Sequence, residues 1–254
     1  MSWPRFRTLE SFREQNPGWE ITLYRGKSGA GAWRTTEQQD AGRYHGEDHL
    51  PRVAGLDVEE RELDLALPDG CSHVHASDLM AWHVLATEGG VVADMDIAWL
   101  RPMETLGIFE SNARAGLTCF RRHPKPGYLP VTFMVSAGDV PFFAHVLKRA
   151  LAAHDPDVYE SCGSGCLGSW GEALAGCPGM YRLPDEVVYP FTHLGYSDMI
   201  RALHLPAYGQ RSMRSVGMHW YAGHPLSQKA NLTITAENVH SNPSALAVAL
   251  RCHA

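Results

Sequence analysis

The chain has 254 residues, 44% of them hydrophobic, and a formal net charge of −6 at pH 7. That length suits a single large α/β domain, and the apolar content is enough for a sizeable core. The mildly negative charge gives no reason to expect a nucleic-acid partner, and no apolar run is long enough to cross a membrane.

The N-terminal half contains segments with three different patterns. Apolar residues spaced three apart predict an amphipathic helix over residues 5–15, and alternation predicts a strand over residues 19–24. Residues 25–50 are polar and Gly-rich, which is typical of a long loop, and residues 53–67 are acidic and weakly helical. Residues 77–88 are predicted as a helix, with Ser77 as its N-cap and Gly89 and Gly90 as its stop.

In the C-terminal half, short apolar strands alternate with helices. We expect strands at residues 91–93, 97–100, 116–120, 131–135 and 180–183, and helices at 141–153, 167–175 and 241–252. Residues 91–93 are wholly apolar, which predicts an inner strand buried on both faces. The alternation predicts an α/β fold with a mostly parallel central sheet.

The most informative stretch ends in two carboxylates, Asp94 and Asp96, directly after the strand at 91–93. Side chains two residues apart on an extended chain point to the same side, so both carboxylates can bind one hard cation. Oxygen ligands suit Mg²⁺ or Mn²⁺, which keep positions open for phosphate oxygens. The pattern therefore indicates an enzyme that handles a diphosphate.

Several stretches, taken in order, resemble the sugar-binding region of DXD-containing glycosyltransferases. These are the family 32 type enzymes, related to the yeast mannosyltransferases and the glucosylating clostridial toxins. The central stretch runs from Ala76-Ser77-Asp78 through Glu88-Gly89-Gly90-Val91-Val92-Ala93-Asp94-Met95-Asp96 to Leu100-Arg101-Pro102. The flanking stretches are residues 8–21, 131–141 and 181–190, and Gly217-Met218-His219-Trp220 followed by Gly223.

The resemblance implies a GT-A-like, Rossmann-type three-layer sandwich that forms one catalytic domain over residues 1–254. Residues 25–70 would then be a variable loop or helical insert, and residues 227–254 a C-terminal tail and helix. It also implies a metal-dependent retaining glycosyltransferase of the hexosyltransferase type, with Mn²⁺ or Mg²⁺ as cofactor. The donor would be a nucleotide sugar, most simply a UDP-sugar, and the acceptor a glycan, a protein or a modified nucleic-acid base.

Carried over residue by residue, the resemblance assigns the metal to Asp94 and Asp96, with His219 as a further ligand of the metal or of the diphosphate. Asp78 would bind the ribose or base of the nucleotide, Asp94 would lie between ribose and metal, and Trp220 would line the donor site. The family usually has an arginine three residues after Asp78, where this chain has Ala81. The chain begins close to the early helix, so Trp3 is considered as a stacking surface for the nucleotide.

The residues themselves leave alternatives open. Asp78 can also be a simple helix cap, and His73 and His75 have strand spacing for a metal pair or are structural. The basic cluster at residues 121–125 is either a solvated loop or a site for an acidic acceptor. Asp185 and Glu186 are the candidates if a carboxylate takes part in the chemistry.

Two other functions use the same residues. A metal-dependent phosphoesterase needs two metals and more ligands than the chain offers at recognisable spacings. A silent nucleotide-sugar binding protein is compatible with Ala81. The absence of a signal peptide predicts a cytoplasmic protein, in which the six cysteines are expected to be reduced thiols.

Overall fold

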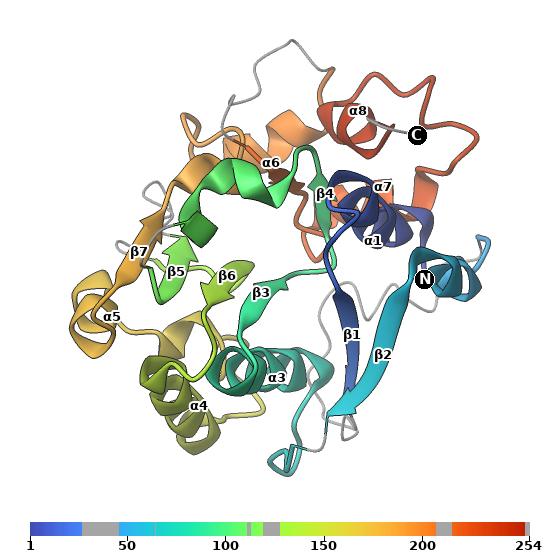
Figure 1. Cartoon of the computed structure of the whole chain (residues 1–254). Coiled ribbons are helices and arrows are strands. Elements are labelled where there is room, and N and C mark those ends of the chain that lie inside the picture. Colours follow the sequence, from blue (N-terminus) through green and yellow to red (C-terminus); the bar gives the residue numbers. More distant parts are fainter. Residues whose placement is uncertain (27–45, 64, 111–112, 119–127, 207–214, 252–254) are drawn as a thin grey trace.

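A computed structural model describes residues 1–26, 46–63, 65–110, 113–118, 128–206 and 215–251. The basic cluster at 121–125 and most of the loop predicted at 25–50 lie outside these residues. The described chain is a mixed α/β structure in which helices surround three small sheets (Figure 1). Among the described residues, no helix combines the length and the apolar character needed to cross a membrane.

The largest sheet is mixed, whereas the sequence predicts a mostly parallel one. Its four strands, in the order β3–β6–β5–β7, are β3 (Gly90–Ala93), β6 (Phe133–Ser136), β5 (Ala115–Thr118) and β7 (Met180–Leu183). Strand β6 is antiparallel to both β3 and β5, and only the β5–β7 pair is parallel. The sequence between β5 and β6 has no helical pattern, and parallel neighbours usually need a helical crossover.

Strand β3 lies at the edge of this sheet, with β6 as its one described neighbour. Residues Val91 to Ala93 are half-buried, so the prediction of an inner strand buried on both faces is wrong. An apolar run alone does not distinguish an inner strand from an edge strand that lines a cavity.

The acidic segment at 53–67, predicted as weakly helical, is helical only at its start and then forms a strand. A 3₁₀ helix at Leu50–Leu56 ends at Asp57, whose φ of 53° lies in the left-handed region, and β2 (Val58–Leu63) follows. Strand β2 pairs in parallel with β1 (Ile21–Gly26), which leaves its acidic side chains exposed. Backbone pairing with a distant strand thus decides the conformation here, which local propensity cannot reveal.

The third sheet joins two distant segments, β4 (Ile97–Trp99) and β8 (Gly217–His219), in an antiparallel pair. Between β3 and β4, residues 94–96 form a turn that leads from the four-stranded sheet to this one. We call these three residues the metal loop. Asp94 and Asp96 therefore converge on a turn and not on one continuous extended strand.

Seven α-helices complete the described fold: α1 (Trp3–Gln15), α3 (His73–Thr87), α4 (Pro141–Ala153), α5 (Trp170–Gly176), α6 (Tyr196–Leu203), α7 (Pro225–Thr233) and α8 (Ala245–Arg251). Helix α4 and strand β7 have the predicted bounds, and α1, α5 and α8 lie within the predicted regions or extend them by a few residues. Helices α6 and α7 and strand β8 were not predicted.

Helix α3 begins one turn earlier than predicted. Its N-cap is Ser72, whose hydroxyl accepts from the His75 backbone N–H at 3.3 Å, and not Ser77. Asp78 therefore lies inside the helix and does not cap it. His73 and His75 are in the first turn and not on a strand, and the buried His75 ring lies 3.1 Å from the Val158 carbonyl.

Two main clusters of buried side chains support the sheets. One includes Trp99, Phe133 and Leu246 and lies around β4, β8 and the C-terminal helices. The other includes Trp82 and Phe143, whose rings stack where α3 packs on α4. The cysteines at 71, 162, 166 and 177 are buried and free, as expected for reduced thiols.

Candidate metal centre

Asp94, Asp96 and His219 meet at the metal loop. One ligand atom from each residue lies within 4.8 Å of those of the other two, and this is the one such group of three found in the described part of the chain. His219 Nε2 is 3.1 Å from Asp96 Oδ1 and 4.0 Å from Asp94 Oδ2. The structure thus brings together the three residues predicted as metal ligands.

The register of β4 and β8 explains why residues so far apart in sequence meet. Ile97 pairs with His219, and the Trp220 N–H donates to the Asp96 carbonyl at 2.9 Å. On the other side of the loop, the Asp94 N–H donates to the Thr132 carbonyl at 2.9 Å, which continues the β3–β6 ladder by one bond. Each aspartate is therefore held by a different sheet.

The Asp96 carboxylate is buried but incompletely paired. Its Oδ2 accepts from the Ala222 N–H at 2.7 Å, and Tyr221 reaches this arrangement through a left-handed φ of 53°. Its Oδ1 is buried and makes no hydrogen bond with acceptable geometry to any described residue, although His219 Nε2 lies nearby. A buried carboxylate oxygen that is paired with an imidazole nitrogen but forms no well-aligned hydrogen bond can bind a cation in its place.

The charges in this group shift each other's pKa values. Burial raises the pKa of Asp94 to about 6, and the charge of Asp96 adds to this effect. Burial also opposes ionisation of Asp96, but the charges of His219 and Arg5 outweigh it and lower the pKa of Asp96 to about 2. Burial disfavours the protonated form of His219, but Asp96 and Asp94 outweigh it, so the pKa of His219 is raised.

Two carboxylates and one imidazole form a donor set that fits a divalent cation. Carboxylate oxygens suit Mg²⁺ and Mn²⁺, whereas imidazole is a ligand of transition metals. Asp96 Oδ1 lies 3.1 Å from His219 Nε2 without a hydrogen bond of acceptable geometry, so a cation bound between the two side chains would take the place of this contact. The residues present therefore fit the predicted metal site.

The metal centre lies in a cavity of about 1400 Å³. Its walls come from α1, the β1–β2 sheet, α3, the metal loop and the segment after β8. Asp78, Asp94, Asp96 and His219 all line it. The volume exceeds the roughly 300–1,000 Å³ of a typical small-molecule site.

Asp78 lies on the α3 wall of this cavity, apart from the three metal-ligating candidates. Its carboxylate packs against Gly163, where an added Cβ would be 2.6 Å from Asp78 Oδ2. Burial raises the pKa of Asp78 well above its ordinary value, and the charges of Asp94 and Glu160 raise it further. Ala81, where the resemblance expects an arginine, also lines the cavity.

Trp3 and Trp220 do not line the cavity. Both rings are buried in the core, Trp3 at 4% exposure and Trp220 at 0%. Trp220 contributes to the metal centre through its backbone N–H. Neither Asp185 nor Glu186 is among the cavity-lining residues, and both lie in a short 3₁₀ helix at Asp185–Val187.

Sequence reasoning missed Arg5 and a group of tyrosines. Arg5 lines the cavity from α1 and donates to the Met95 carbonyl at 3.2 Å. The rings of Tyr189 and Tyr221 are stacked at 6.0 Å, and the Tyr221 ring centroid is 4.1 Å from that of His219. The helical spacing of residues 5, 8 and 12 is a signal for one face of α1, but no local pattern indicates which element that face meets.

No family model matches the chain, and no curated protein matches it. Among solved structures, the chain is similar to one described as "PaToxG Glycosyltransferase". The two are 12% identical, and the alignment covers 99% of this chain and 82% of that chain with a TM-score of 0.48. A TM-score below 0.5 at this identity does not establish a shared fold.

Proposed function

We propose that this protein is a metal-dependent glycosyltransferase that moves a sugar from a nucleotide-sugar donor to an acceptor hydroxyl. The observation that carries the proposal is the incompletely paired Asp96 carboxylate, which faces His219 and Asp94 in a cavity large enough for a donor and part of an acceptor. The resemblance of residues 76–102 to the DXD sugar-binding region supports the same function.

We propose Mn²⁺ as the preferred cation, held by Asp94, Asp96 and His219. Mg²⁺ prefers an all-oxygen set and keeps several waters, so the imidazole favours the transition metal. When bound, the cation would offset the negative charge that builds on the leaving diphosphate.

Asp78 and Arg5 are proposed to bind the donor on either side of the metal loop. The Asp78 side chain lines the cavity and would hydrogen-bond a ribose hydroxyl or a base N–H. Arg5 brings a guanidinium to the same cavity, and guanidinium groups bind phosphate oxygens well. Arg5 would then replace the arginine that the resemblance expects at Ala81.

For the sugar transfer, we propose a front-side route with retention of configuration. The two carboxylates considered as nucleophiles, Asp185 and Glu186, lie outside the cavity lining. In the front-side route the leaving diphosphate accepts the proton of the acceptor hydroxyl, and no side-chain nucleophile is needed.

The test is to incubate the protein with Mn²⁺ and a panel of UDP- and GDP-sugars and to follow release of the free nucleoside diphosphate. We expect slow hydrolysis of one donor, lost in Asp96→Ala and kept in Asp198→Asn. Asp198 is a matched control because its carboxylate is exposed, in a surface pair with Arg201.

Two results would overturn the proposal. Donor binding without turnover would indicate a silent binding protein. Cleavage of simple phosphodiesters with no preference for nucleotide sugars would indicate a phosphoesterase.

A further inference from the structure

Helix α1 runs beside the segment that contains the metal loop and β4, and it is hydrogen-bonded to this segment at three points. The Met95 carbonyl accepts from Arg5 Nη1 and Thr8 Oγ1, both at 3.2 Å. The Trp99 N–H donates to Ser11 Oγ at 3.1 Å. The Met103 N–H donates to Asn16 Oδ1 at 2.8 Å, so α1 supports the segment at every fourth residue from 95 to 103.

The middle residue of the metal loop has a second attachment to α1. The Met95 side chain packs against the small cluster formed by Phe6, Leu9 and Val53. Met95 is thus held through its carbonyl and its side chain by the same helix. Since Asp94 and Asp96 flank Met95, any shift of α1 changes where their carboxylates point.

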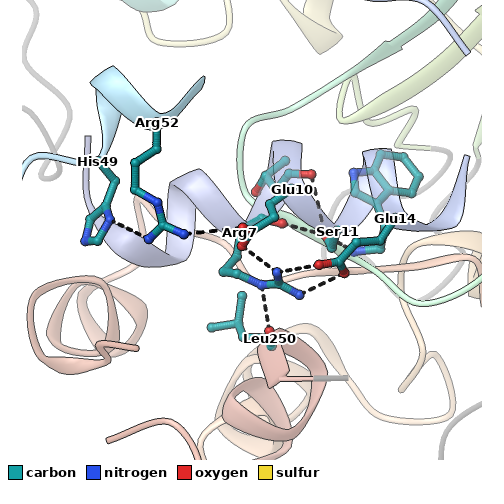
Figure 2. Close-up of polar contacts among 9 residues, drawn as sticks. Arg7, Glu10, Ser11, Glu14, His49, Arg52 and Leu250 are labelled. Carbon is teal, nitrogen blue, oxygen red and sulfur yellow. Dashed lines mark hydrogen bonds and ion pairs between the residues drawn. The ribbon is translucent and has the colours of Figure 1, made fainter. Parts of the chain in front are cut away.

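Helix α1 is also fixed to the C-terminal part of the chain by a buried arginine. With 3.6 residues per turn, Arg7, Glu10 and Glu14 share one face, and Arg5 points away from it. Arg7 is 2% exposed, and its Nε donates to the Leu250 carbonyl at 2.9 Å (Figure 2).

The guanidinium of Arg7 also binds two carboxylates of its own helix. Nη1 contacts Glu10 at 2.5 Å and Glu14 at 2.9 Å, and Nη2 contacts Glu14 at 3.1 Å. The Leu250 carbonyl belongs to the last turn of α8, where helix carbonyls lack partners within the helix. Arg7 therefore joins α1 to the end of α8 with a planar fork that lysine cannot reproduce.

We infer that Arg7 is a positioning residue for the metal loop. It fixes the placement of α1 against α8, and α1 in turn fixes Met95 and the separation of the two aspartates. The inference rests on the proposed function in one respect, namely that the metal loop binds a cation.

The first test measures Mn²⁺ affinity by electron paramagnetic resonance, in which free Mn²⁺ gives the signal. We expect Arg7→Lys to weaken Mn²⁺ binding about tenfold, within the range found when residues that orient metal ligands are changed. The matched control is Arg251→Lys on α8, which removes donors to the His240 and Val239 carbonyls without touching α1. Unchanged Mn²⁺ affinity in a folded Arg7→Lys protein would overturn the inference.

A second readout needs no metal. The ¹³C-methyl resonance of Met95 should shift in Arg7→Lys and stay unchanged in Arg251→Lys, and the absence of a shift would also overturn the inference. If the wild-type protein binds no Mn²⁺, the proposed function is wrong. The methyl resonance of Met95 still shows whether Arg7 positions the metal loop. If Arg7→Lys does not fold, Mn²⁺ affinity and the Met95 resonance are measured on Glu14→Gln instead. We expect this variant to lose two- to threefold in Mn²⁺ affinity (~0.5 kcal/mol).

Discussion

Helix α1 contacts two groups of charged side chains, and the hydrogen bonds of these groups differ in completeness. At Arg7, each guanidinium nitrogen donates to a carboxylate or a carbonyl. At the metal loop, Asp96 Oδ1 and His219 Nδ1 are buried without hydrogen-bond partners among the described residues. The fully hydrogen-bonded Arg7 has a structural role, whereas the incomplete hydrogen bonding at the metal loop indicates a ligand site.

The pKa shifts distinguish Asp94 from Arg7. Burial opposes the charged form of Arg7, but its bonds to Glu14 and Glu10 outweigh this and raise its pKa. In the metal loop, by contrast, burial and the neighbouring Asp96 together raise the pKa of Asp94 to about 6. The charged form of Asp94 thus carries an electrostatic cost in the absence of a cation, whereas the charged forms of Asp96 and Arg7 are stabilised by their partners.

The largest expected effect is on activity. Replacement of Asp96 by Asn should lower the rate of donor hydrolysis by about 100- to 1000-fold. The change removes an anionic ligand of a cation that would lower the activation free energy by several kcal/mol. Nucleoside diphosphate release measures the rate, and Asp198→Asn should retain it. If Asp96→Asn keeps more than about a tenth of the activity, Asp96 is not a metal ligand.

The next effect is on stability. The change Arg7→Met should lower the free energy of unfolding by about 3 kcal/mol, since it removes one partner of a buried ionic group. Glu10 and Glu14 are partly exposed and can rehydrate, which limits the loss. Urea unfolding at pH 7 gives this number. A loss no larger than that of Arg251→Lys would show that the completely paired group has no special structural role.

A smaller effect should appear in donor binding. An added methyl in Gly163→Ala would meet Asp78 Oδ2 at 2.6 Å and push the carboxylate from its place. We expect the KM for the donor to rise by about tenfold, or ~1.4 kcal/mol, with kcat little changed. Gly55→Ala is the control, because nothing lies within 4 Å of an added Cβ there and Gly55 is not among the cavity-lining residues. Equal KM values for the two variants would show that Asp78 does not bind the donor.

The smallest effect depends on pH. Because the pKa of Asp94 is raised to about 6, its ionised form lowers the free energy of unfolding above pH 6. This loss disappears as the pH falls below 3.8, the ordinary pKa of an aspartate. Without metal, Asp94→Asn should therefore be more stable than wild type at pH 7, by an amount that disappears near pH 4. Unfolding at the two pH values measures it. A wild-type protein that is the more stable one at pH 7 would contradict the account.

Local sequence predicted some parts of this site and not others. The convergence of Asp94 and Asp96 was predictable because the two residues are neighbours after an apolar strand. His219 was predicted as a ligand only from the family resemblance, because its position depends on the long-range register of β4 and β8. Arg5 was missed because the pattern of α1 gives its apolar face but not the element it contacts.

The errors in the fold have similar causes. Ser72 and Ser77 are both good N-caps, and only the packed structure selects Ser72 as the start of α3. The strand β2 was expected as a weak helix because its pairing partner, β1, lies beyond a long intervening segment. The prediction of a mostly parallel sheet was wrong because strand direction depends on the connections between strands, which have no clear sequence pattern.

The most direct test is anomalous diffraction at the manganese edge, with crystals grown in Mn²⁺ and UDP. We expect one manganese peak bound by Asp94, Asp96 and His219, with Asp96 Oδ1 as a ligand. A structure in which the Asp96 carboxylate faces away from the manganese, or in which no peak lies at the metal loop, would contradict it.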